Sequence, residues 1–170
     1  FMLYKKVDSI EIKNETVAKI TGRIQDGAMA FLFAEYKMLS MFIAAVAVLL
    51  LLGGEENGLG METMIAFIIG ALCSVAAGFS GMRSATSANG RTAQAAADGG
   101  QAEALTTSYN GGAVMGLAVG GLGLAGISLM YYFTQTEFLT VENIAGFGMG
   151  ASSIALFARV GGGILSLIHI

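Results

Sequence analysis

Residues 111–133 read GGAVMGLAVGGLGLAGISLMYYF, an apolar run without one charged side chain. About 20 such residues are what an α-helix needs to cross the hydrocarbon core of a membrane. The chain contains 25 Gly and no Pro, which suits membrane helices that pack backbone to backbone. Tyr131, Tyr132 and Phe133 close the run where an aromatic belt lies in membrane proteins. The run therefore predicts a membrane-spanning helix.

Further apolar stretches surround this run on both sides. The sequence predicts transmembrane helices at about 38–53, 61–82, 105–133 and 143–164, so that residues 38–164 form four spans. The second continues as a polar, Ala-rich helical extension to residue 98, before a stop at Gly99-Gly100. Of the 170 residues, 55% are hydrophobic and 12% charged, against about 25% charged in soluble domains. We expect an all-α, polytopic membrane bundle.

Residues 1–37 form a separate, charged segment. Val17, Ile20, Ile24, Ala28 and Phe31 recur at helical spacing, which indicates an amphipathic helix lying along the cytoplasmic membrane surface. An ordinary solvated helix face fits the same pattern. The first span is short unless residues 31–33 extend it, with Glu35 and Lys37 reaching toward the interface.

The charged residues predict an orientation. Residues 1–37 carry most of the basic side chains, and Arg83 and Arg91 follow the second span. The connections 53–60 and 134–143 contain Glu but no Lys or Arg. The positive-inside rule then places the N-terminal segment and the connection after the second span in the cytoplasm. The net charge of −3 is too small to say anything about nucleic acid, but the basic residues form no stripe with interleaved aromatic residues, which argues against nucleic acid as a partner.

Glycines repeat every four residues on two of the predicted helices. One set is Gly112, Gly116 and Gly120, and the other is Gly146 and Gly150. Each set lines one helix face, which predicts close helix–helix packing. The GxGxxG pattern at 121–126 lies inside an apolar helix rather than after a strand, so we do not read it as a dinucleotide site.

Arg159 is the single Lys or Arg inside a predicted span. A cation at that depth is costly unless a carboxylate or a water-filled cavity faces it; alternatively, the helix ends nearby and Arg159 reaches the cytoplasmic interface. No Asp or Glu lies in the middle of a span to pair with it. Ser152 and Ser153 lie nearby on the same helix. Cys73 and His169 are single, so no metal site or catalytic set is predicted from them.

Three ordered runs carry a family resemblance. They are 23–37 (RIQDGAMAFLFAEYK), 79–93 (FSGMRSATSANGRTA) with 109–126 (YNGGAVMGLAVGGLGLAG), and 146–164 (GFGMGASSIALFARVGGGI). Together they resemble the membrane-bound, ion-translocating inorganic pyrophosphatases, and the last run is the most specific of them.

The resemblance implies a sixteen-helix fold, usually a homodimer, that couples hydrolysis of Mg²⁺-bound pyrophosphate to transport of H⁺ or Na⁺. It implies a multi-pass protein of a bacterial or archaeal cell membrane. The four spans would be the family's second to fifth helices in an N-terminal fragment. Arg159 matches the family's ion-gate arginine, which faces a carboxylate on another helix. No catalytic or metal-binding residue is carried over, because residues 165–170 depart from the family pattern, so the fragment alone is expected to be inactive.

Two other classes of membrane protein fit the sequence less well. A Gly-rich, proton-carrying rotor subunit needs a carboxylate near the middle of a Gly-rich helix pair, which residues 105–164 lack. A non-catalytic four-helix membrane adaptor needs a self-sufficient bundle, whereas an unpaired Arg159 and open glycine faces indicate missing neighbours.

Overall fold

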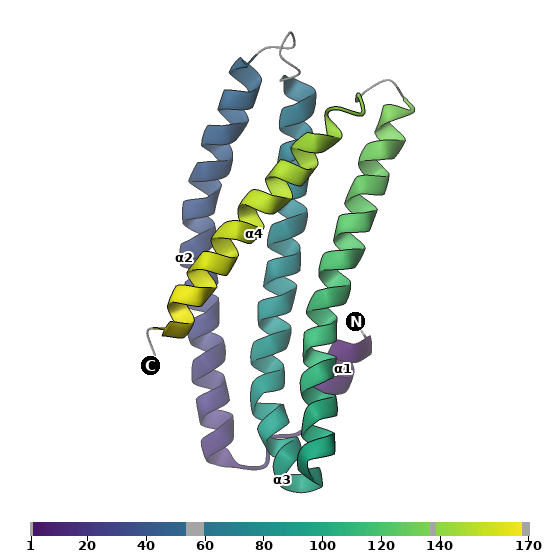
Figure 1. The fold of residues 1–170 in the computed structure, drawn as a ribbon. Coiled ribbons are helices and arrows are strands. Elements are labelled where there is room, and N and C mark those ends of the chain that lie inside the picture. Colours follow the sequence, from purple (N-terminus) through teal and green to yellow (C-terminus); the bar gives the residue numbers. More distant parts are fainter. Residues whose placement is uncertain (1, 54–59, 137–138, 168–170) are drawn as a thin grey trace. The chain divides into compact units, whose positions relative to one another are not determined.

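The computed structural model describes residues 2–53, 60–136 and 139–167, and every regular element in them is helical. The helices are α1 (Met2–Asp8), α2 (Glu15–Leu52), α3 (Met61–Thr134) and α4 (Ile144–Leu167), as Figure 1 shows. Three stretches are long and apolar enough to cross a membrane: α2, α3 and Ile144–Gly162 of α4. The prediction of an all-α membrane fold is confirmed.

Helix α3 contains two of the four predicted spans because it folds back on itself. Gly100 is the one described residue inside it with non-helical angles, at φ 77° and ψ −165°, a region that glycine enters without the penalty of a Cβ. The arms before and after it run side by side (Figure 1), and Ser84 Oγ donates to the carbonyl of Gly111 at 3.0 Å. The turn lies at the Gly99-Gly100 pair where the sequence predicts a helix stop.

The sequence predicts an amphipathic helix within residues 1–37, whereas the structure has two helices there, α1 and the start of α2. The chain leaves the helical conformation between α1 and α2, and Asn14 starts the second helix. Asn14 Oδ1 accepts hydrogen bonds from the backbone N–H groups of Thr16 and Val17, at 2.9 and 3.3 Å, which is the geometry of an N-cap. Helix α2 then continues to Leu52 without a break, so the expected boundary at 37/38 lies inside a helix.

The chain divides into two compact units. Unit 1 comprises Phe1–Phe33 and Ala77–Val119, and unit 2 comprises Ala34–Ala76 and Gly120–Ile170. Unit 2 has two apolar clusters. Buried residues of the first are Ala66, Met130, Leu139 and Phe147, with Cys73 packed against them; those of the second are Leu39, Ala71 and Ile154, one from each of α2, α3 and α4.

Helix α4 approaches the first arm of α3 closely through glycines in unit 2. A Cβ added at Gly146 would lie 2.7 Å from the carbonyl oxygen of Thr63, and one at Gly150 would overlap that of Phe67. On the other side of the contact, a Cβ at Gly70 would overlap the carbonyl oxygen of Phe147. Without side chains at these positions the two backbones gain van der Waals contact, which drives helix association in a membrane.

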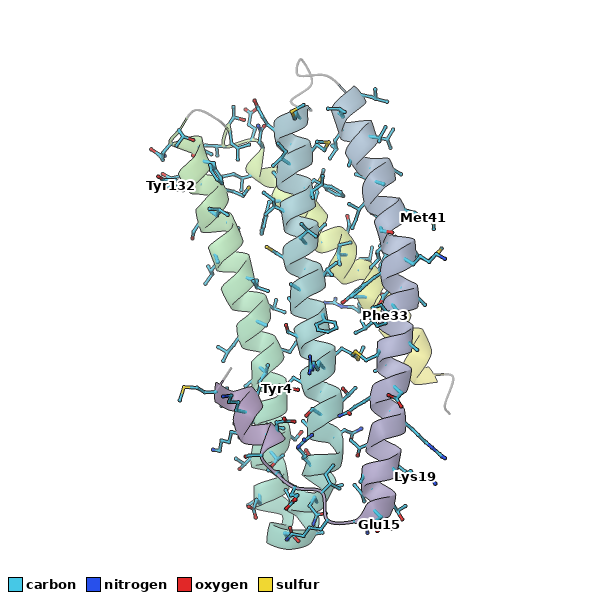
Figure 2. The ribbon with its side chains drawn as sticks, turned by 180° about the vertical axis from the view of Figure 1, so that it is seen from behind. Tyr4, Glu15, Lys19, Phe33, Met41 and Tyr132 are labelled. Atoms are coloured by element: carbon cyan, nitrogen blue, oxygen red, sulfur yellow. The ribbon has the colours of Figure 1, made fainter. Side chains whose placement is uncertain are left out.

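Many large apolar side chains of the described residues are exposed. Tyr132 is 64% exposed and projects outward from the last turns of α3, as Figure 2 shows. Others are distributed over the three long helices, among them Phe33, Met41, Leu49, Leu72, Leu117, Leu124 and Leu156. So much exposed apolar surface is unusual for a soluble monomer, and it suits contact with lipid or with further helices.

Some sequence-based expectations lie outside the described residues. They concern residues 54–59 of the first acidic connection, residues 137–138 of the second, and residues 168–170, which include His169. Of the tail at 165–170, residues 165–167 belong to α4.

Candidate functional site

Arg159 lies on α4 on the side away from the helix packing. Ile154 marks the packed side, since it is 2% exposed in the cluster with Leu39 and Ala71. At about 100° per residue, Arg159 is turned roughly 140° from Ile154, and its side chain is exposed. No ion pair or hydrogen bond joins Arg159 to another residue of the described parts of this chain. The predicted carboxylate partner would therefore come from outside it.

Apart from Arg159, the exposed face of α4 is mostly apolar. The rings of Phe157 and Phe42 meet edge to face with centroids 5.0 Å apart, which ties α4 to α2 beside the arginine. The residues that share the arginine's side, Met149, Ser152, Leu156 and Val160, are exposed. A single cation on such a face costs about 3 kcal/mol or more at a bilayer centre if it stays unpaired. An unpaired arginine on an apolar face therefore needs either a polar partner or access to water.

The two predicted glycine sets differ in their surroundings. Gly146 and Gly150 lie against the backbone of α3, as described above. A Cβ added at Gly112, Gly116 or Gly120 would meet no atom within 4 Å. The glycine face on the second arm of α3 therefore has no neighbour among the described residues of this chain.

A pocket of about 500 Å³ lies in unit 1 and was not predicted from the sequence. Its polar lining comes from three helices: Tyr4 and Asp8 on α1, Gln25 and Asp26 on α2, and Arg83, Thr86, Ser87 and Arg91 on α3. The two arginines balance the two aspartates, so the pocket shows no strong preference for an anion or a cation.

Arg91 ties α1 and the following turn to α3. Its Nη2 lies 2.7 Å from Asp8 Oδ1 and donates to the Asp8 carbonyl at 3.2 Å. Its Nε donates to the carbonyl of Ile10 at 3.2 Å, and its Nη1 donates to Ser87 Oγ at 2.7 Å. In the sequence, Arg91 contributes only to the charge pattern that predicts the membrane orientation. The Ser87–Arg91 spacing of four on one helix is the local pattern that could have indicated a contact between these two side chains.

A second ion pair holds the end of the same connection. Lys13 Nζ lies 2.9 Å from Asp98 Oδ2, and the Lys13 backbone N–H donates to Gln94 Oε1 at 3.1 Å. The hydrogen bond to Asp98 raises the pKa of Lys13. Hydrogen bonds from Lys13 and Gln94 lower the pKa of Asp98. Both side chains are largely exposed, so the pair contributes little stability.

The described residues offer no constellation for hydrolysis. No group of three or more His, Cys, Asp or Glu side chains among them could hold a metal ion. The Mg²⁺ implied by the resemblance therefore finds no set of ligands within residues 2–53, 60–136 and 139–167.

Comparison with known proteins gives a consistent match. The family model described as inorganic H⁺ pyrophosphatase matches residues 1–167. The chain is 49% identical over 164 residues to a Clostridium tetani protein named "Putative K(+)-stimulated pyrophosphate-energized sodium pump", covering 96% of this chain and 23% of that protein. It is 40% identical over 153 residues to a K⁺-insensitive pyrophosphate-energized proton pump of Methanosarcina mazei, covering 90% and 22%. A K⁺-stimulated pyrophosphate-energized sodium pump of Thermotoga maritima is 35% identical over 169 residues, covering 88% and 23%. The chain thus spans less than a quarter of the length of these relatives.

Proposed function

This chain belongs to the inorganic H⁺ pyrophosphatase family, and on that premise we propose that it is part of a primary pump coupling pyrophosphate hydrolysis to the transport of H⁺ or Na⁺. Relatives named as proton pumps and as sodium pumps both support this coupling. The hydrolytic residues and the Mg²⁺ ligands belong to the part of such a protein that this chain does not contain. The chain by itself is inactive and contributes helices to the ion path.

Arg159 is the coupling residue of this part of the pump. The observation that carries this role is its exposed position on a mostly apolar face of α4 without an ion-pair partner in the described chain. A carboxylate from a helix outside the chain neutralises it there. The fixed positive charge of Arg159 holds that carboxylate and restrains ion passage until hydrolysis rearranges the helices. Removing the charge should therefore uncouple transport from hydrolysis.

The glycine face of Gly112, Gly116 and Gly120 receives another helix of the same pump. Support comes from the open space at these positions and from the relatives' much greater length. The pump is a multi-pass homodimer of a bacterial or archaeal cell membrane, with the N-terminal segment and Gly100 on the cytoplasmic side. The basic residues of 1–37 support that orientation.

The test uses the full-length protein reconstituted into sealed lipid vesicles with Mg²⁺. Pyrophosphate is added outside, and phosphate release is followed together with uptake of H⁺, by a pH-sensitive dye, or of ²²Na⁺. The proposal expects hydrolysis and uptake of one ion to start together and to stop when pyrophosphate is consumed. Hydrolysis with neither ion moved, in vesicles shown to be tight, would contradict it.

A further inference from the structure

Glu35 on α2 has buried carboxylate oxygens without a hydrogen-bond partner among the described residues. Both carboxylate oxygens have less than 1 Å² of accessible surface, and neither accepts a hydrogen bond within the described part of the chain. From the sequence, Glu35 was expected to reach toward the membrane interface. The structure turns its carboxyl group inward instead, whereas Phe33, two residues earlier, is 73% exposed.

The position of Glu35 on the helix explains its enclosure. It lies three residues after Leu32 and four before Leu39, both buried, and residues at these spacings share one helix face. The next residue, Tyr36, donates its hydroxyl to the carbonyl of Val75 on α3 at 3.2 Å. Leu39 belongs to the cluster that joins α2, α3 and α4 in unit 2. Glu35 therefore lies at the edge of a packed layer.

None of the neighbouring titratable groups neutralises Glu35. On the parts of α2, α3 and α4 in unit 2 that form this layer, those groups are Tyr36 and Lys37, Cys73, and Arg159. Tyr36 bonds to a backbone carbonyl, Lys37 and Arg159 are exposed, and Cys73 packs in the other apolar cluster.

An ionised carboxylate in this position would be expensive. An unpaired charge taken out of water carries a large free-energy penalty even after the protein relaxes. A cationic side chain from elsewhere in a larger protein would have to reach oxygens that this chain already covers. A proton needs no such space, because it adds to one oxygen and leaves the packing unchanged.

We propose that α2, a candidate membrane-spanning helix, carries a proton-binding site in which Glu35 is held as a neutral carboxylic acid. The proton comes from water and joins the carboxylate when the helices around it part, and it is retained when they close. No other bond forms or breaks. This group is distinct from Arg159 and its predicted partner, so the chain brings a second ionisable element to the membrane-spanning region.

Infrared spectroscopy of the full-length protein in lipid vesicles at neutral pH tests the proposal. The expected result is a carbonyl stretching band of a protonated carboxylic acid, shifted in ²H₂O, that disappears in Glu35→Gln. Gln matches the size of the neutral acid and leaves the packing intact. The matched control is Glu62→Gln, since Glu62 is exposed and its Oε2 accepts a hydrogen bond from Asn143 at 2.7 Å; the band assigned to Glu35 should remain in this variant.

The infrared spectrum would also reveal an ionised Glu35. If Glu35→Gln removes carboxylate bands and no carboxylic acid band, the group is ionised and the proposal is wrong. The unfolding temperature gives a second reading: it should be unchanged in Glu35→Gln, whereas a clear drop would indicate a lost ion pair with a cation. Neither measurement requires pumping, so failure here would leave the proposed pump function standing.

Discussion

The ring of Phe157 on α4 packs edge-on against the ring of Phe42 on α2, at a centroid distance of 5.0 Å and an interplanar angle of 62°. Aromatic pairs in this geometry add stability beyond their contact area. The contact fixes the rotation of α4 about its axis two residues before Arg159. The arginine, about 200° further around the helix, is consequently exposed on the side of α4 away from α2.

Replacing Arg159 tests its proposed role in coupling. In the full-length protein, Arg159→Ala should lower pyrophosphate-driven ion uptake at least about tenfold, equivalent to about 1.4 kcal/mol, because the partner carboxylate loses its counter-charge. Arg159→Lys should restore part of the uptake, since it keeps the charge but not the planar fork. Uptake is measured in vesicles beside phosphate release.

Lys19→Ala is the control for this change, since Lys19 is also an exposed cation and extends outward from α2 (Figure 2). It should leave uptake unchanged. Arg159→Ala with normal uptake per phosphate released would remove Arg159 from the coupling mechanism.

Helix positions followed from the sequence because apolar length is a strong signal. The sequence predicts spans that begin near residues 61 and 143 and a helix stop at Gly99-Gly100; α3 begins at Met61, α4 begins at Ile144, and Gly100 has non-helical angles. The break before Asn14 was not, since an N-cap depends on one side chain, and the apolar periodicity of residues 17–31 obscured where the helix begins. Asn14 followed by a helical pattern was the signal that could have been used.

Side-chain partners across the chain were less predictable. Arg91 meets Asp8 and Ile10 only because α1 docks on α3, and no local pattern encodes that contact. The inward turn of Glu35 likewise depends on how α2 rotates against its neighbours. Arg159 could be singled out because a charge within an apolar stretch is visible without any structure.

Gly150 should tolerate no side chain. A Cβ there overlaps the carbonyl oxygen of Phe67 and lies 3.0 Å from the backbone nitrogen of Ala71, and neither backbone atom can move without separating α4 from α3. Gly150→Ala should cost about 1–3 kcal/mol, as overpacking does in protein cores. The measurement is thermal unfolding of the full-length protein in detergent.

Gly148→Ala is the matched control on the same helix. A Cβ at Gly148 meets no atom of the described residues within 4 Å, and Ala is the better helix former by about 1 kcal/mol. Its unfolding temperature should be unchanged or slightly higher. Equal effects of the two substitutions would mean that the close approach at Gly150 does not contribute to stability.

Arg91 should hold α1 in place. Arg91→Ala removes the ion pair with Asp8 and the bond to the carbonyl of Ile10; hydrogen bonds to charged groups contribute about 1.5–3 kcal/mol each, with less expected here because Asp8 is half exposed. We expect residues 2–14 to exchange amide hydrogens at least several-fold faster, while α4 is unaffected. Hydrogen exchange read by mass spectrometry gives this region by region.

Arg83→Ala controls for the loss of an arginine from α3. Arg83 lines the same pocket but its side chain is exposed, and it should leave exchange in residues 2–14 unchanged. If both variants loosen α1 equally, the effect comes from net charge rather than from the contacts of Arg91.

The Lys13–Asp98 pair should give the connection before α2 a pH dependence. The folded pKa of Asp98 is lowered, so its contribution is present above the unfolded value, about 3.9, and is lost as the pH falls through the lower folded value. The folded pKa of Lys13 is raised, so its contribution is complete below about 10.4 and is lost as the pH rises through the higher folded value. Amide exchange near Lys13, corrected for its intrinsic pH dependence, should therefore be slowest between these limits.

The protection should weaken in high salt, because the exposed pair is screened. Asp98→Asn should remove the acid limb of this profile, and Glu103→Gln, which changes another acid of α3, should not. A profile identical in Asp98→Asn and the unmodified protein would show that the pair does not hold this segment.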